Sequence, residues 1–240
     1  FEAAGGSARF EGRMSQALEA EGQMSLSTSS TSTFMQSLGL GAAELPRGMG
    51  QAIDMTGQVT FSGGEIVNLR GMTLKLDQNT LTGDADIRLG GAKPQITAKL
   101  AAGALDFASL AAEGGSGGGE SSAGWSKTTI DASGLAAVNA EVSLAVQSLD
   151  AGMIKLGASS LGVSLDNSRL VLKLPKATGY GGQISGEFVV NNRGGLSVGG
   201  NLNILQADVK SLLVDLMGVE RLSGKGDGFV KFLGSGSNLH

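Results

Sequence analysis

A unit that occurs three times at nearly constant spacing is the feature that most constrains this 240-residue chain. Each copy has an apolar-x-Gly strand start, a run with alternating apolar residues, and a Ser-Leu pair in a short segment with helical spacing. The copies begin at Phe10-Glu11-Gly12, Leu81-Thr82-Gly83 and Ile184-Ser185-Gly186, with alternating runs from Met24, Ile96 and Val198 and leucines at Leu38, Leu110 and Leu212. Repetition of this kind predicts an elongated array of strands rather than one round core.

The strand segments alternate cleanly between apolar and polar residues. The run from Val138 to Val146 places its even-numbered residues on one apolar face and Glu141 and Ser143 on the other. Turns of two to five residues between such runs favour antiparallel meanders. The predicted fold is therefore mainly β with a few short helices: an antiparallel, strongly curved repeating sheet, or β-groove. Forty glycines are consistent with strong curvature, since glycine marks bends and bulges in sheets.

Only short helices are available to cover the apolar face of such a sheet. Helical spacing predicts helices at residues 31–40, 104–112 and 207–216, and Pro46 near a segment start predicts another at 45–53. A ten-residue helix is about 15 Å long, whereas six strands span nearly 30 Å. The sheet must therefore curl on itself, pack against a second sheet, or present part of its face to an apolar ligand.

A Gly/Ser-rich segment divides the sequence. We interpret residues 113–124 as a linker between strand repeats with short helices at 1–112 and a second β module at 125–240. The glycine run at 114–119 is not followed by the Lys-Ser/Thr of a phosphate-binding loop, so a linker is the favoured interpretation. Because the chain starts at Phe1 with no signal-like segment, we expect it to be a fragment of a longer protein.

Composition argues against most catalytic classes. The net charge of −4 gives no electrostatic footprint for nucleic acid, and no cysteine is present. The single histidine is His240, at the end of the sequence, which disfavours a histidine triad or a zinc site. Carboxylates such as Asp84, Asp86, Asp131 and Asp166 could act as acid and base or bind calcium, but solvated strand and turn residues are the favoured interpretation. We therefore expect no enzyme activity, no metal and no cofactor.

An ordered series of motifs resembles a known family. Residues 130–135 (IDASGL), 170–186 (LVLKLPKATGYGGQISG), 207–213 (ADVKSLL) and 222–226 (LSGKG) follow one another as in the C-terminal module of AsmA-like proteins. The resemblance is strongest over residues 125–237, while 1–112 resembles a more divergent stretch of that family. It implies relation to the TamB and chorein β-groove proteins, which are thought to carry phospholipids between membranes. It also implies a periplasmic location in Gram-negative bacteria, an inner-membrane anchor outside this chain, and a role in outer-membrane biogenesis.

These arguments predict a non-enzymatic protein whose apolar β-groove shields or carries phospholipid acyl chains. The alternative is a structural or adhesin-like β-array with a sealed core and no ligand. The candidate lipid-contacting residues are Val142, Leu144, Val146, Leu170, Leu172, Leu174, Ile184, Phe188, Val190, Val198 and Leu202.

Overall fold

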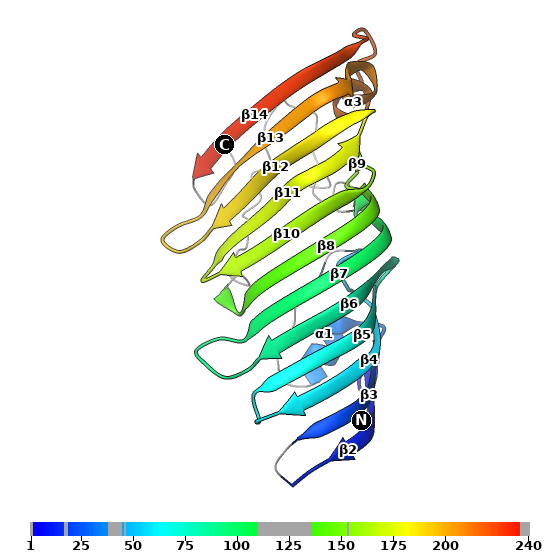
Figure 1. Ribbon diagram of the computed structural model, residues 1–240, viewed down its shortest axis with the longest axis vertical. Coiled ribbons are helices and arrows are strands. Elements are labelled where there is room, and N and C mark those ends of the chain that lie inside the picture. The colour runs from blue at the N-terminus through cyan, green and yellow to red at the C-terminus, as the bar shows by residue number, and fades with distance from the viewer. Residues whose placement is uncertain are drawn as a thin grey trace.

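The chain forms one long, open β-sheet in a computed structural model that describes residues 2–16, 19–37, 45, 47–109, 136–152 and 154–235. Thirteen strands follow one another as neighbours from β1 to β14, and the short strand β9 pairs with β8 beside this path. The strands run obliquely across an elongated ladder, with the first strands at one end and the last at the other (Figure 1). The predicted mainly-β, largely antiparallel class is confirmed.

The strands of the sheet are mostly nine to twelve residues long, and two helices have both ends within the described residues. The strands are β1 (Glu2–Ala3), β2 (Gly6–Met14), β3 (Ala20–Thr28), β4 (Ile53–Ser62), β5 (Ile66–Leu76), β6 (Asn79–Arg88), β7 (Gln95–Asp106), β8 (Asn139–Asp150), β9 (Lys155–Leu156), β10 (Ser159–Asp166), β11 (Arg169–Gly179), β12 (Gly182–Asn191), β13 (Ser197–Asp208) and β14 (Lys225–Ser235), and the helices are α1 (Thr31–Ser37) and α3 (Val209–Met217).

One pair of strands departs from the antiparallel pattern. Strands β7 and β8 pair in parallel, with Gln95 opposite Asn139 and Asp106 opposite Asp150. Parallel neighbours need a crossover of a dozen or more residues, and residues 107–138 supply it. The predicted linker at 113–124 falls within this crossover and outside the described residues. The sheet nevertheless continues from the first predicted part of the chain into the second.

The predicted helices are found at two places and are wrong at others. Helix α3 begins at an N-cap, where the Asp208 carboxylate accepts the Ser211 N–H, and ends at Gly218 in the left-handed conformation. The expected helix at 45–53 is wrong, because residues 47–52 form turns. In the expected helix at 104–112, residues up to Asp106 belong to β7, while Ala108 and Ser109 are helical and the rest lies outside the described residues.

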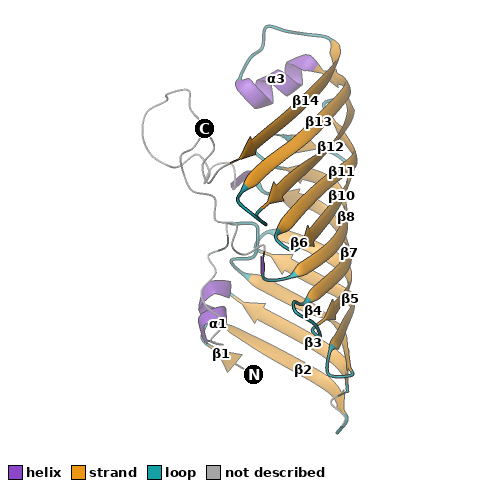
Figure 2. Cartoon of the chain, turned by 90° about the vertical axis from the view of Figure 1, so that its left-hand side faces the viewer, coloured by secondary structure: helices purple, strands orange, loops and turns teal. Residues whose placement is uncertain are grey.

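The two ends of the strands differ in their connections. We call the end that carries α1 and α3 the helix end, and the other, which carries the β2–β3, β4–β5, β6–β7, β10–β11 and β12–β13 turns, the hairpin end. Both helices lie on the same side of the sheet (Figure 2). Phe34 of α1 is buried, and its ring lies beside Gly6, while Leu212 of α3 packs against a cluster of apolar residues on β11 to β13.

In the described strands, three bulges interrupt the ladder, in β5 at Arg70–Gly71, in β11 at Pro175–Lys176 and in β13 at Leu205–Gln206. Gly71 and Gln206 have positive φ angles of 57° and 56°. A bulge adds one residue to one strand, bends it and increases its local twist. Because each bulge adds one residue, the positions that point to a given face change from odd to even numbers, or the reverse, across it. The apolar residues change in the same way, so the same face is apolar on both sides of the bulge.

Candidate apolar ligand surface

Cross-strand pairing aligns apolar residues into three rows that each run across twelve strands. The face on which they lie is called the apolar face below, and it is the face that contacts the helices. The middle row is Gly12, Gly22, Val59, Leu69, Ala85, Ala98, Val142, Val163, Leu172, Phe188, Gly200 and Phe232. The row nearer the hairpin end is Met14, Ala20, Phe61, Val67, Ile87, Ile96, Ala140, Leu165, Leu170, Val190, Val198 and Gly234. The row nearer the helix end is Ala8, Leu26, Met55, Leu74, Leu81, Ala102, Val146, Ser159, Ala177, Ile184, Ile204 and Gly228.

All eleven predicted lipid-contacting residues lie on strands and on this apolar face. Eight of them belong to the three rows. The other three, Leu144, Leu174 and Leu202, lie between the middle row and the row nearer the helix end. The sequence therefore identified one contiguous surface, because side chains on a strand alternate between faces with a period of two. Their contact with lipid is a prediction.

Exposure divides these residues into two groups. Val146 and Ile184 are only 5% and 3% exposed, and both belong to clusters packed by the protein's own side chains at the helix end. The other nine are half-buried, with neither full cover nor full exposure. In the same clusters, Leu105 and Ala177 are 2% and 0% exposed. A ligand on the apolar face would therefore meet the half-buried group and not Val146 or Ile184.

Helix α3 covers the helix end through a hydrogen-bonded anchor. The Tyr180 hydroxyl accepts the Lys155 N–H at 3.1 Å and donates to the Asp215 carboxylate at 3.0 Å. Burial raises the pKa of the Tyr180 phenol, and the charge and hydrogen bond of Asp215 act in the same direction. The phenol is thus held in its neutral form, the form that can donate to α3.

In the N-terminal half, the turns at 47–52 are fixed by Asp77. Its carboxylate accepts the N–H groups of Gly48, Gly50, Gln51 and Ala52 at 2.7 to 3.2 Å. Burial opposes ionisation, but the four donors together outweigh it and hold the pKa of Asp77 below its ordinary value. The local sequence pattern predicted a helix at 45–53, but a distant residue, Asp77, holds this segment in turns.

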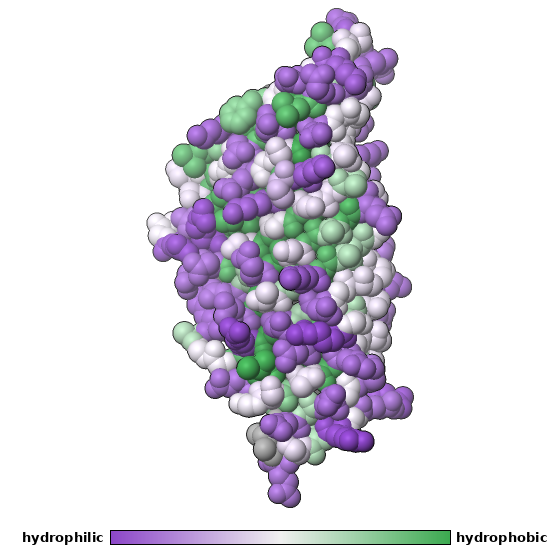
Figure 3. All heavy atoms as spheres, viewed as in Figure 1, coloured by the Kyte–Doolittle hydropathy of each residue, from purple (hydrophilic) through white to green (hydrophobic). Residues whose placement is uncertain are grey.

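The face opposite the helices is mainly hydrophilic, although apolar side chains are visible in its middle and at its upper edge (Figure 3). Asp84 and Asp86, which point the same way from β6, both support the bulge of β5. Asp84 accepts the Gly71 N–H at 2.9 Å, and Asp86 pairs with Arg70 at 2.5 Å. Asp166 pairs with Arg193 at 2.6 Å in the same way at a hairpin turn. These contacts give the described carboxylates structural roles, while Asp131 lies outside the described residues.

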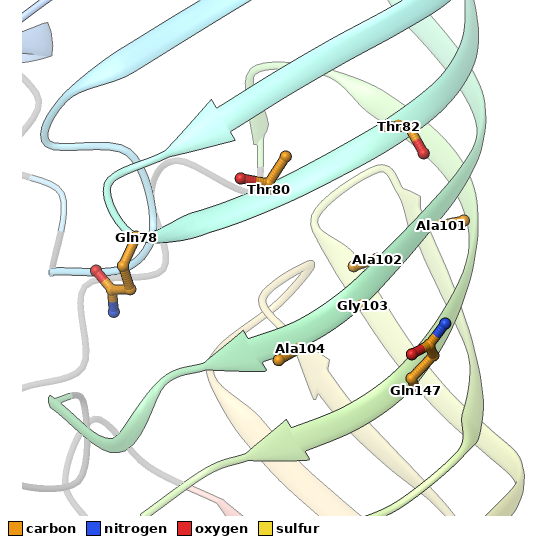
Figure 4. Close-up of a pocket in the computed structure, with 8 residues that line it drawn as sticks. All are labelled: Gln78, Thr80, Thr82, Ala101, Ala102, Gly103, Ala104 and Gln147. Atoms are coloured by element: carbon orange, nitrogen blue, oxygen red, sulfur yellow. The ribbon is translucent and has the colours of Figure 1, made fainter.

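Shallow hollows occur on the part of the sheet that the structure describes, and two of them are wide enough to consider as sites. One of about 440 Å³ is lined by residues of β6, β7 and β8, including Thr80, Thr82, Ala101 and Gln147, and no titratable side chain lines it (Figure 4). The other, of about 430 Å³, lies across β7, β8, β10 and β11 and includes Lys99, Lys173 and Pro175 but no carboxylate.

Sequence reasoning missed the N-terminal part of the apolar face. Val59, Leu69, Met72, Ala85 and Ala98 form a buried cluster there, with further half-buried residues packed around it. The signal was present as alternation in residues 53–102, but it was diluted by glycine and alanine at positions on the apolar face. The apolar surface thus extends over both halves of the chain.

The described residues contain no group of acidic or histidine side chains arranged to hold a metal ion. Within the same residues, no helix has the length and apolar character needed to cross a bilayer. No known protein family, curated protein or solved structure matches this chain.

Proposed function

We propose that this chain is a non-enzymatic periplasmic protein of outer-membrane biogenesis that shields phospholipid acyl chains on its apolar face and carries them between the inner and outer membranes. The observation that carries the proposal is the set of three apolar rows, none of which contains a charged residue. At a strand spacing of about 4.8 Å, each row runs for about 50 Å. An acyl chain has no hydrogen-bonding groups, so a continuous apolar surface is the feature that binds it.

The half-buried state of the hairpin-end side chains supports the proposal. Val190, Val198 and Leu170 keep part of their apolar surface accessible. Covering apolar surface contributes roughly 25 cal/mol per Å², so an acyl chain laid on these residues would be stabilised in proportion to the area it covers. Methylene groups form no hydrogen bonds, which suits the row nearer the hairpin end, since its side chains carry no polar groups.

The bulges and the glycines of the rows support the predicted curvature of the sheet into a groove. Bulges bend strands, and Gly12, Gly22 and Gly200 place no side chain on the middle row. In the proposal, the apolar face is the floor of this groove and the helices lie along one wall. Selectivity would be for hydrophobic chains rather than headgroups, because no cluster of basic residues occurs in the sequence. The inner-membrane anchor would be a segment outside this chain, as the AsmA-like resemblance implies.

The competing function is a structural array with a sealed core, and the sealed clusters at the helix end favour it. The two functions differ in what the hairpin end does, since only the first requires a ligand there. A photoactivatable phospholipid in vesicles separates them, because it reports whether acyl chains reach the apolar face.

The most informative variant pair lies on β12. Phe188→Glu places a charge in the middle row, and Ser185→Glu places the same charge on the opposite face of the same strand. We expect Phe188→Glu to reduce photo-cross-linking severalfold and Ser185→Glu to leave it nearly unchanged, with both variants checked for an intact fold by circular dichroism. Equal labelling of the two variants, or no lipid bound to the unmodified protein by native mass spectrometry, would contradict lipid carriage.

A further inference from the structure

Strand β14 exposes large apolar side chains on both faces, although Lys225, Asp227 and Lys231 share the opposite face with Phe229 and Leu233. Val230 and Phe232 belong to the apolar face and are 53% and 45% exposed, while Phe229 and Leu233 point to the opposite face and are 66% and 84% exposed. Phe232 meets Phe188 of β12 at a ring-centroid distance of 6.1 Å. Among the described residues, no strand pairs with the other side of β14.

The opposite face changes character toward this edge. One of its cross-strand rows is polar from β2 to β10 and apolar from β11 to β14. This row is Arg13, Glu21, Thr60, Asn68, Asp86, Thr97, Glu141, Ser164, Val171, Val189, Gly199 and Leu233. An exposed, apolar edge strand is a template for pairing, and proteins usually protect such edges with charges or cover. Strand β2 at the other end of the sheet carries Arg9, Glu11 and Arg13 on this face with no apolar side chain between them, whereas on β14 Phe229 and Leu233 stand among the charges.

We propose that β14 pairs with β14 of a second copy of this chain, in an antiparallel register centred on Phe229. In this register Asp227 faces Lys231 of the other copy, and by symmetry the pair occurs twice. Val230 faces Gly228, and Phe232 faces Gly226, so each large side chain on the apolar face lies opposite a glycine of the other copy. Phe229 packs against its own symmetry mate on the opposite face.

The neighbouring registers are less complementary. Residues directly opposite each other must share a face, so the centre can shift only in whole-residue steps, and the nearest alternatives lie one residue away on either side. A centre at Val230 places Leu233 opposite Asp227, and a centre at Gly228 places Lys231 opposite Lys225. Opposite charges across strands stabilise pairing and like charges destabilise it, so the charge pairs select the Phe229 centre, in which Leu233 faces Lys225.

The charges needed for this pairing are accessible. Lys231 is exposed and makes no ion pair with any described residue. Asp227 accepts the Gln206 N–H through Oδ1 at 2.7 Å, and its carboxylate has a second oxygen. The pairing would also extend the apolar face across the two-fold axis into the second copy.

A single-cysteine experiment tests the register, because the chain contains no cysteine. Phe229→Cys places two sulfhydryls opposite each other across the axis, within the Cα separation that a disulfide tolerates. Lys231→Cys is the matched control on the same face, where the two cysteines lie about 13 Å apart along the strands. Under mild oxidation of the full 240-residue chain, we expect a disulfide-linked dimer from Phe229→Cys and little from Lys231→Cys.

Sedimentation of the unmodified protein provides the second measurement. We expect a concentration-dependent dimer, and we expect Lys231→Glu to weaken it roughly tenfold because two like-charge pairs replace two attractive ones. Circular dichroism of each variant shows whether its fold is intact. A monomer at all concentrations up to about 100 μM, a range in which micromolar affinities are detected, would overturn the proposal. Equal cross-linking of the Phe229→Cys and Lys231→Cys variants would overturn it as well, because the interface would then lie elsewhere.

Discussion

At the helix end of β11 to β13, apolar side chains are almost inaccessible, whereas a few residues farther along the same strands they are half-exposed. Ile184 and Val190 illustrate the difference, because both lie on β12 and on the apolar face. The first is packed among Leu156, Ala177 and Ile204, close to α3. The second lies at the hairpin end, where the described residues provide turns and no α-helix.

This comparison teaches that strand patterning and burial are separate properties. Alternation places both residues on the same face, but cover depends on α3, β9 and the turns at 47–52, all of which lie at the helix end. On β11 to β13 the apolar face is thus divided into a sealed part at the helix end and an accessible part at the hairpin end, whereas in the N-terminal half the middle-row residues Val59, Leu69 and Ala85 are buried as well. The sealed part contributes stability, and the accessible part is where we propose that acyl chains bind.

The largest expected effect tests the sealed part directly. Ile184→Ala should lower the free energy of unfolding by about 3 kcal/mol, because it removes buried methylenes and leaves a cavity. Leu170→Ala, at the hairpin end of the same face, should cost about 1 kcal/mol because its side chain is only half-buried. Urea unfolding of the two variants measures both values, and equal losses would abolish the distinction between the two ends.

The next effect concerns the cover of the N-terminal half. Asp77→Asn removes the charge that four backbone N–H groups share, and we expect a loss of about 1 kcal/mol after allowing for solvent screening. Because the folded pKa of Asp77 lies below its ordinary value of 3.8, its contribution is present above that pH and is lost as the pH falls through the folded value.

Unfolding measured between about pH 2 and pH 6 should therefore show a shallower acid loss in Asp77→Asn than in the unmodified protein. Asp54→Asn is the control, since Asp54 accepts one hydrogen bond from Ser27 and holds no turn. If the two variants have the same acid profile, Asp77 does not control this cover.

The smallest effect concerns the anchor of α3. Tyr180→Phe keeps the ring but removes the hydroxyl that joins Lys155 to Asp215, with an expected loss of about 1 kcal/mol or less. Hydrogen exchange should become faster in α3 and at the helix end of β12, while the hairpin end is unchanged. Faster exchange at the hairpin end as well would mean that α3 supports the whole sheet and not one end of it.

Much of the fold follows from local pattern, and the errors have identifiable causes. Helix α3 was predictable because its N-cap, apolar spacing and terminal glycine all lie within about a dozen residues. The expected helix at 45–53 failed because Asp77, 25 or more residues away, binds the backbone donors of that segment. The expected helix start at Ala104 failed because β8, beyond a long crossover, pairs with β7 as far as Asp106.

The candidate surface was predictable in its direction and not in its extent. The eleven residues share a face because alternation fixes the side on which each lies. Which residues join them in the rows depends on strand register, which changes at the bulges in β5, β11 and β13. Val59 and Leu69, for example, are paired next to the bulge at Gly71. A single sequence gives weak signals for bulges.

The sequence by itself determined which side chains lie together on one face, because a period of two is a local property of extended backbone. Tertiary structure decided that both halves join in a single sheet, that the helix end of β11 to β13 is sealed, and that β14 forms an exposed edge. Those features depend on pairings between residues far apart in the chain, whose energies arise only when strands, helices and turns meet.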